Sequence, residues 1–335
     1  MANDSPKTDS PNSNPVSRRL REKDTTPDTV LPSPAEIIPD DQHAILNYVD
    51  LDGVPQKLEY RNLAKLDSMP VPMPIDREGY GTVEHSPNYW ATGHGDWLNV
   101  CEAIERYMNP TDKSQPLRLM DFGCATGRFL RHSYVFGKEK IDSWGCDFAP
   151  ANVAWSKQHL APEIKIILNS DVPHLPFEDG YFDIVTAFSV FTHIDVLEDA
   201  WLLELRRITS PGGLLYLTIQ NEATWAKIVD RPSYQKHIFR ANDVPGNFEL
   251  TDEHFHKPLP QQRMAFRMSQ ADVYNRNVWM SSDYIHQNWS RYFEILDIAN
   301  NAHTCFQSPV IMRPLSGVAA TKTASVPAEQ VSNDS

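Results

Sequence analysis

Length and composition set the first limits on what this chain does. It has 335 residues, of which 41% are hydrophobic and 22% are charged, and its formal net charge at pH 7 is -13. A chain of this size can bury a full core as one large domain or two small ones. The negative balance repels phosphate backbones and disfavours a nucleic-acid partner, and the compact basic cluster at residues 18–23 lies in a polar segment.

Cysteine spacing and hydropathy argue against a metal centre, a leader and a membrane anchor. The four cysteines are far apart and form no CxxC pair, so we expect reduced thiols and neither a zinc ribbon nor an iron–sulfur site. The N-terminus lacks the apolar stretch of a signal peptide, and no run of about 18 apolar residues could cross a bilayer. We therefore expect a cytoplasmic protein.

Two segments of the chain lack any regular pattern. Residues 1–39 are rich in Ser, Pro, Asp and Asn, and residues 317–335 are similarly small and polar. Such segments cannot bury enough apolar surface to fold, so both are predicted to be disordered tails. The working domain is predicted to span residues 40–316.

The first predicted elements follow in chain order. Apolar residues at helical spacing predict an amphipathic helix over residues 95–110, with Asp96 as its cap and Pro110 as its stop. Strands and helices then alternate, and a helix near Asp195 carries Glu198 three residues later, as in a capping box. The predicted strands are 117–122, 142–148, 164–168, 182–191 and 214–219, and the helices before Asp195 are 126–137 and 150–162.

This alternation predicts a parallel sheet with helices on both faces. It breaks after Gln220, where a polar, aromatic-rich insertion over residues 222–280 is predicted to form a substrate cap. A short helix at 281–292 and two strands, 293–299 and 308–314, then close the sheet.

The stretch "DFGCATG", residues 121–127, forms the loop after the first strand. In an open parallel sheet, ligands bind beyond the carboxyl ends of the strands, and this loop is the usual floor of the site. Gly123 permits a tight turn, and Ala125 and Gly127 let the backbone approach a ligand. The N–H groups at the start of the next helix favour an anionic group.

Two nucleotide motifs do not fit this loop. A dinucleotide fingerprint needs glycines where Ala125 and Arg128 stand, and a P-loop needs a terminal Lys followed by Ser or Thr. Asp121, two residues before Gly123, instead favours a ligand with an ammonium group beside a carboxylate. The methionine end of S-adenosylmethionine has this chemistry.

With these residues the chain resembles the class I S-adenosylmethionine-dependent methyltransferases, whose first motif is D/E-x-G-x-G-x-G. Asp121, Gly123 and Gly127 match it, and Ala125 replaces the middle glycine. The expected fold is α/β, a Rossmann-like three-layer sandwich around a seven-stranded, mostly parallel sheet with an antiparallel closing strand.

The resemblance covers about residues 117–220 and implies a set of cofactor contacts. Asp147 falls where the family's acid accepts hydrogen bonds from the ribose hydroxyls. Asp171 falls where an acid meets the adenine amino group, with Val172 beside the ring. The cofactor residues implied in this way are Asp121, Gly123, Cys124, Ala125, Gly127, Asp147, Phe148, Asp171, Val172, Phe188 and Ser189.

Other residues are candidates for the acceptor side. His193, after the fourth strand, is predicted as a general base, with a structural histidine as the alternative. Arg128 opposes the dipole of its helix, so it either meets an anion or is solvated. Tyr89, Trp90 and His94 are expected to form a lid before the first helix, and Tyr274, Arg276 and Trp279 of the insertion are further pocket candidates. The HxH spacing at His254 and His256 is read as a solvated loop rather than a metal site.

The predicted function is transfer of a methyl group from S-adenosylmethionine to an oxygen, nitrogen or carbon atom of a small-molecule acceptor. The motifs of DNA amino- and cytosine-methylating members are missing, and a protein acceptor stays open. The alternatives are a non-catalytic scaffold or sensor that binds the cofactor, and an aminopropyl transferase. The sequence does not indicate the acceptor or the oligomeric state.

Overall fold

The computed structural model describes residues 30–41, 45, 48–108, 115–268, 276–300, 302 and 306–315. The predicted C-terminal tail and residues 1–29 of the predicted N-terminal tail lie outside these ranges. Residues 30–39 are described, and Pro34–Ile37 form a short helix, α2, with Ser33 and Glu36 in a capping box. Ile38 next to it is buried. Order therefore extends N-terminal to the predicted boundary at residue 40.

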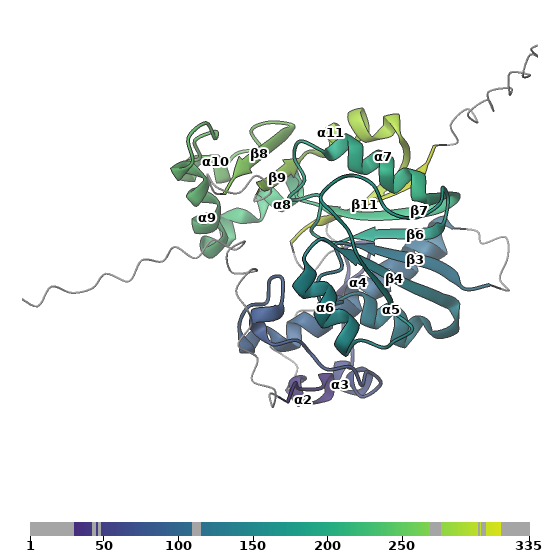
Figure 1. Ribbon diagram of the computed structural model, residues 1–335. Coiled ribbons are helices and arrows are strands. Elements are labelled where there is room, and N and C mark those ends of the chain that lie inside the picture. The colour runs from purple at the N-terminus through teal and green to yellow at the C-terminus, as the bar shows by residue number, and fades with distance from the viewer. Residues whose placement is uncertain are drawn as a thin grey trace, which may run out of the picture.

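A seven-stranded sheet forms the centre of the molecule (Figure 1). Its strand order is β10-β11-β7-β6-β3-β4-β5. The five strands β3 to β7 run parallel, and β11 is antiparallel to both of its neighbours, which confirms the predicted fold class. The strands are β3 (Leu117–Phe122), β4 (Ile141–Asp147), β5 (Lys165–Leu168), β6 (Phe182–Ala187), β7 (Thr209–Ile219), β10 (Phe293–Ile298) and β11 (Ser308–Pro314).

Successive strand residues supply two separate hydrophobic cores, one on each face of the sheet. Leu119 of β3 belongs to one core and Met120 to the other, and Ile184 and Val185 of β6 divide in the same way. This follows from the alternation of side chains along a strand. Helices α4, α5 and α6 cover the first face, and α7 and α11 cover the second (Figure 1). The helices are α4 (Ser86–Tyr107), α5 (Leu130–Gly137), α6 (Pro150–His159), α7 (Glu198–Ile208) and α11 (Ser282–Asn288).

Helix α4 begins at Ser86, so the prediction of a helix capped by Asp96 was wrong. Asp96 lies inside the helix and is fully buried. The glycines in this half of α4 obscured the pattern, but Gly93 has a packing role. A Cβ atom there would lie 2.4 Å from the carbonyl oxygen of Arg128 and 2.9 Å from the His132 ring, so glycine lets α4 approach the start of α5 closely.

Helix α7 also departs from the prediction. It starts at Glu198, and neither Asp195 nor Glu198 caps it. Both carboxylates instead bind Arg263, at 3.0 Å from Asp195 and 2.9 Å from Glu198. Because Arg263 comes from the distant insertion, the local capping pattern could not reveal this arrangement.

The predicted insertion folds into a small cap with its own apolar core around Trp225, Phe255 and Trp279. In Figure 1 it lies beside the sheet, with α9, α10 and the paired strands β8 and β9 grouped together. Its elements are α8 (Glu222–Ala226), α9 (Pro232–Phe239), α10 (Asp252–Phe255), β8 (Arg263–Arg267) and β9 (Arg276–Met280).

A short N-terminal region precedes α4. Its elements are α2, β1 (Tyr48–Val49), β2 (Pro55–Gln56) and α3 (Tyr60–Ala64). Among the helices of the described ranges, none is long and apolar enough to cross a membrane.

The close approach at Gly93 predicts that Gly93→Ala lowers the free energy of unfolding by about 1 to 3 kcal/mol, because the new methyl group meets backbone that cannot move away easily. Urea denaturation measures this change. The control is Gly212→Ala, whose Cβ atom would meet nothing within 4 Å and should change stability by less than about 0.5 kcal/mol. Equal effects of the two substitutions would contradict the packing argument.

Candidate functional site

The loop after β3 folds back tightly against the end of β4. The N–H groups of Gly123 and Cys124 both donate to the carbonyl oxygen of Cys146, each at 2.9 Å. Gly123, Ala125 and Gly127 have φ angles of 77°, 48° and 74°. This run of left-handed backbone is favourable for glycine and costs about 1 to 2 kcal/mol at an alanine.

Side-chain packing also requires the two glycines of the loop. A Cβ atom at Gly123 would lie 2.5 Å from a methyl carbon of Val190, and one at Gly127 would lie 2.4 Å from a methyl carbon of Leu160. Ala125 stays left-handed because its N–H donates to Oδ2 of Asp147 at 2.9 Å. The carboxylate at the end of β4 thus holds the loop that follows β3.

Asp147 is buried and accepts two further hydrogen bonds at its other oxygen. Oδ1 lies 2.8 Å from the N–H of Ala149 and 3.3 Å from Nδ2 of Asn152. Burial raises the pKa of Asp147, and the hydrogen bonds from Ala149, Ala125 and Asn152 oppose that rise. The predicted ribose acid therefore also organises the loop.

Asp121 is buried at the end of β3. Its Oδ1 accepts a hydrogen bond from Oγ1 of Thr186 on β6, at 2.9 Å. Burial raises the pKa of Asp121 to about 7, against the lowering effect of the Thr186 bond and of Arg128. A carboxyl group in this state suits a cationic ligand, because a nearby ammonium would replace the proton.

Exposed apolar side chains lie next to the predicted adenine position. Phe148, which follows Asp147, is 51% exposed, and Val172, which follows the exposed Asp171, is 60% exposed. The N–H of Asn169 donates to the carbonyl oxygen of Asp147 at 3.2 Å and holds the loop after β5 against the end of β4. The described structure brings the predicted acids and both apolar side chains to one edge of the sheet.

Arg128 meets an anion of the protein itself. Its Nη1 lies 2.6 Å from Oδ2 of Asp96, the buried carboxylate of α4. The guanidinium also lies 5.7 Å from the centre of the Phe188 ring. Arg128 lies just before α5, and Asp96 of α4 compensates its charge. Sequence reasoning missed this partner because Asp96 was assigned to a cap.

The predicted lid residues are parts of α4. Trp90 is fully buried, its Nε1 donates to Oδ2 of Asp67 at 2.8 Å, and its ring stacks on His94. Tyr89 is also buried, and its hydroxyl lies 3.2 Å from Oγ1 of Thr126 in the motif loop. The expectation of a lid at this segment was wrong: Tyr89 braces the loop and Trp90 packs in a core.

Ser189 and His193 lie after β6. Ser189 has a φ angle of 60°, and its N–H donates to Oγ1 of Thr218 at 2.8 Å. Nδ1 of His193 lies 2.7 Å from the carbonyl oxygen of Arg276 in the cap, and the Arg276 guanidinium lies 3.7 Å from Asp195. Tyr274 lies outside the described residues.

Backbone strain concentrates at this edge of the sheet. Three of the five described non-glycine residues with positive φ are Ala125, Ser189 and Phe306, the last at 70°. They follow β3 and β6 and precede β11, so all three border the same edge. Such strain persists where the surrounding structure enforces it and is typical of functional sites.

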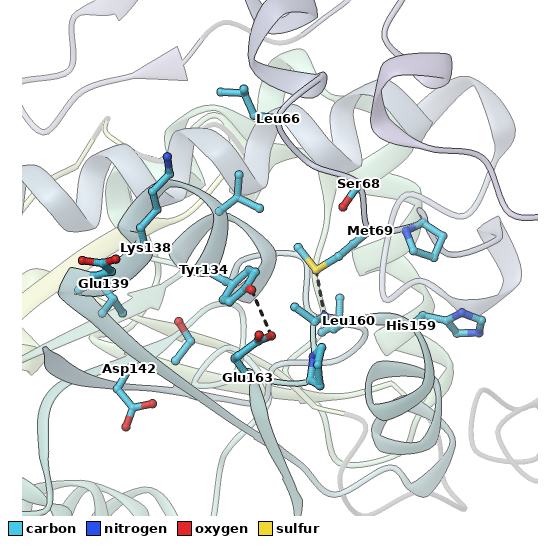
Figure 2. A pocket seen from close by; sticks show the side chains of 16 residues that line it. Leu66, Ser68, Met69, Tyr134, Lys138, Glu139, Asp142, His159, Leu160 and Glu163 are labelled. Atoms are coloured by element: carbon cyan, nitrogen blue, oxygen red, sulfur yellow. Dashed lines mark hydrogen bonds between the residues drawn. The ribbon is translucent and has the colours of Figure 1, made fainter.

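Two other features lie away from this edge. A groove seen in Figure 2 is lined by Tyr134, Lys138 and Glu163, with the Tyr134 hydroxyl 3.1 Å from Glu163, and it contains no residue of the predicted site. In α10, Nδ1 of His254 lies 2.8 Å from Oγ1 of Thr251. The described residues contain no group of three or more side chains that could hold a metal ion.

Comparisons with known proteins agree with this geometry. Residues 120–217 match the family described as "Methyltransferase domain". The chain carries a class I S-adenosylmethionine-dependent methyltransferase domain. The matched residues run from the end of β3 into β7 and include the motif loop, Asp147 and Asp171.

Curated relatives match this chain over part of their length. A demethylmenaquinone methyltransferase of Beutenbergia cavernae is 31% identical over 109 residues, which cover 32% of this chain and 43% of that protein. A malonyl-[acyl-carrier protein] O-methyltransferase of Geobacter sulfurreducens is 27% identical over 116 residues, 34% of this chain and 42% of that protein. The chain spans about half the length of the curated relatives it matches.

Among solved structures, the PH0226 protein from Pyrococcus horikoshii OT3 has a TM-score of 0.42 and 16% identity, covering 68% of this chain and 95% of that chain.

The raised pKa of Asp121 predicts that the stability of the ligand-free protein falls as the pH rises. The pKa of an aspartate carboxyl in an unfolded chain is about 4, whereas burial raises the pKa of Asp121 to about 7 in the folded protein. Between these values the folded state holds a proton that the unfolded state has lost. The free energy of unfolding should therefore fall by at most about 1.4 kcal/mol per pH unit from about pH 5 to 7.

The measurement is urea denaturation at about pH 5, 6 and 7. Asp121→Asn, which cannot ionise, should show a flatter dependence than the unaltered protein. The same slope in both proteins would contradict the assignment to Asp121.

Proposed function

We propose that the protein transfers the sulfonium methyl group of S-adenosylmethionine to an oxygen, nitrogen or carbon atom of a small-molecule acceptor. The observation that carries the proposal is the convergence of Asp121, the left-handed motif loop and Asp147 at one edge of the sheet. Relatives named as demethylmenaquinone and ubiquinone/menaquinone methyltransferases support a small-molecule acceptor.

Each group at this edge has a proposed role toward the cofactor. Asp121 would bind the ammonium group, and the backbone after Gly123 would approach the methionine moiety. Asp147 would accept hydrogen bonds from the ribose, and Asp171 would meet the adenine amino group. The exposed apolar side chains of Phe148 and Val172 would flank the adenine ring, which has two apolar faces.

When bound, S-adenosylmethionine supplies a methyl group on a positively charged sulfur, so the bond to be broken is already activated. The protein then has to align the acceptor behind that methyl group and keep water away. The cap is suited to the second task because β9 is hydrogen-bonded to the segment after β6, with the N–H of Val278 2.8 Å from the carbonyl oxygen of Thr192.

We propose His193 as the base that takes the proton of the acceptor. Because a carbonyl oxygen only accepts hydrogen bonds, Nδ1 of His193 must donate its proton to the carbonyl oxygen of Arg276. In the neutral ring Nε2 then carries the lone pair that can receive a proton. The cap thereby selects the tautomer that general-base catalysis requires.

Binding of the cofactor tests the proposed function first. The unaltered protein should bind S-adenosylmethionine at one site and should not bind NADH. Asp147→Ala should weaken this binding by about 1 to 3 kcal/mol, because it removes ribose contacts and the bond that holds Ala125. Isothermal titration calorimetry measures both.

The matched control is Asp142→Ala, at the opposite end of β4, where the carboxylate pairs with Lys165 at 2.7 Å. It should leave the affinity unchanged. If the two variants bind S-adenosylmethionine equally well, Asp147 does not contribute to the cofactor site, and a lack of binding by the unaltered protein would overturn the proposed function.

The role of His193 predicts a different effect. His193→Gln should lower the rate of methyl transfer by about 10²- to 10⁴-fold and leave the affinity for S-adenosylmethionine unchanged. The readout is radiolabelled methyl transfer to an acceptor found by screening small hydroxylated and amino compounds. His174→Gln, an exposed histidine after β5, is the control, and equal rates in both variants would exclude His193 as the base.

A further inference from the structure

Strand β9 joins the cap to the carboxyl edge of the sheet. Most residues of β9 contact that edge. Its backbone contacts are the carbonyl oxygen of Arg276 with Nδ1 of His193 (2.7 Å), the N–H of Val278 with the carbonyl oxygen of Thr192 (2.8 Å), and the N–H of Met280 with the carbonyl oxygen of Gln220 (2.9 Å). A bridge also pairs Gln220 with Trp279. We call this junction the cap seam.

The side chains of β9 alternate across the cap seam. Val278 and Met280 belong to the core of the main sheet, whereas Trp279 belongs to the core of the cap. Asn277, two residues before Trp279, therefore shares the cap side of the strand. Buried polar atoms of the seam gather on this side.

Tyr234 of α9 reaches the same place from the cap. Nε2 of Gln220 donates to its hydroxyl oxygen at 2.7 Å. Burial raises the pKa of Tyr234, and hydrogen bonds from the side chains of Asn277 and Gln220 oppose the rise. Because the Tyr234 hydroxyl oxygen accepts hydrogen bonds from these amides, its own proton can be donated to another acceptor.

Aromatic side chains surround the Tyr234 ring. Phe306 lies edge-on at 5.1 Å between ring centres, and His237 stacks at 6.0 Å. The Tyr234 ring is partly exposed, as is Phe306. The hydroxyl end of Tyr234 is thus inside the seam, and its ring forms part of an aromatic wall.

Three buried polar atoms at the cap seam have no hydrogen-bond partner among the described residues. They are Oε1 of Gln220, Oδ1 of Asn277 and Nε1 of Trp279. All three side chains are more than nine-tenths buried. Turning an amide through 180° exchanges its nitrogen and oxygen but leaves one of the two atoms without a partner.

This deficit indicates a missing polar group. An unsatisfied buried donor or acceptor costs about 1 to 3 kcal/mol, and native proteins satisfy nearly all of them. The unsatisfied set contains both acceptors and a donor, and a hydroxyl group is the small neutral group that serves both. No charged side chain belongs to this set, so the missing group is neutral.

We propose that the cap seam at Gln220, Tyr234 and Asn277 is the acceptor subsite, and that the acceptor is a neutral ring with hydroxyl groups on adjacent carbon atoms. This inference rests on the proposed methyl transfer and names its substrate class. The reacting hydroxyl lies toward His193 and its neighbour binds the seam. Arg276, whose carbonyl binds His193, directly precedes Asn277 in β9, so one strand places both contacts beside each other.

The proposed reaction balances without a further reagent. The oxygen of the reacting hydroxyl forms a bond to the methyl carbon, the carbon–sulfur bond breaks, and sulfur keeps the electron pair. The hydroxyl proton passes to Nε2 of His193. The products are the methyl ether of the ring and S-adenosylhomocysteine.

The test uses the full chain saturated with S-adenosylhomocysteine and two ring probes, catechol and myo-inositol. Catechol carries its adjacent hydroxyl groups on a flat ring, and myo-inositol carries them on a puckered ring. Isothermal titration calorimetry, supported by saturation-transfer NMR for a weak probe, should show saturable binding of one of them. The probe that binds identifies the flat or the sugar-like form of the proposed acceptor.

Variants then locate the binding. Tyr234→Phe should weaken binding of the probe about fivefold, as expected for one lost hydrogen bond, without changing the affinity for S-adenosylhomocysteine. Tyr181→Phe, at the amino end of the sheet, is the matched control and should bind the probe normally. Asn277→Leu removes the unpartnered Oδ1 together with the hydrogen bond to Tyr234, so it should weaken binding of the probe without changing the affinity for S-adenosylhomocysteine.

The outcomes separate the two proposals. If S-adenosylhomocysteine does not bind, the proposed function fails. If it binds but neither probe does, or if Tyr234→Phe and Asn277→Leu both bind the probe as tightly as the unaltered protein, the acceptor subsite is overturned while the proposed function stands. Weaker probe binding in these variants alone supports the subsite.

Discussion

The hydrogen bond from the N–H of Ala125 to the carboxylate of Asp147 is the constraint on which the candidate site depends. It fixes Ala125 in a left-handed conformation, which is unfavourable for any residue other than glycine. It also joins the ends of β3 and β4. The same carboxylate starts α6 through the N–H of Ala149. The positions of the motif loop, of Phe148 and of the next helix therefore all follow from one buried acid.

Helix α4 supplies the second constraint. A cation just before the N-terminus of α5 is unfavourable, but Asp96 of α4 compensates Arg128 at 2.6 Å. Gly93 allows the close approach that this ion pair needs, and Tyr89 contacts Thr126 of the motif loop. The segment before the sheet thus supports the motif loop through contacts from α4.

The sequence was sufficient where structure follows from local pattern. Apolar strand runs and the helices between them predicted the sheet, and Asp121, Gly123 and Gly127 predicted the loop. It was insufficient where a partner lies far away in the chain: Asp96 and Asp195 were both assigned to local caps, but their partners are Arg128, just before α5, and Arg263 of the cap. For the same reason no sequence pattern links Gln220 with Tyr234, because the two side chains meet only in the folded protein.

The carboxyl edge of the sheet holds several groups that each cost free energy. Near the amino end of β4, Asp142 pairs with Lys165 and Tyr134 binds Glu163. At the carboxyl edge, Asp121 is buried with a pKa raised to about 7, Ser189 is strained, and the amides of the cap seam lack partners. Stability alone would favour removing these features, because each costs free energy. Bound ligands would offset these costs. An ammonium group can replace the proton on Asp121, and hydroxyl groups can satisfy the unpartnered amides of the cap seam. At the carboxyl edge these features are therefore better explained by ligand binding than by folding.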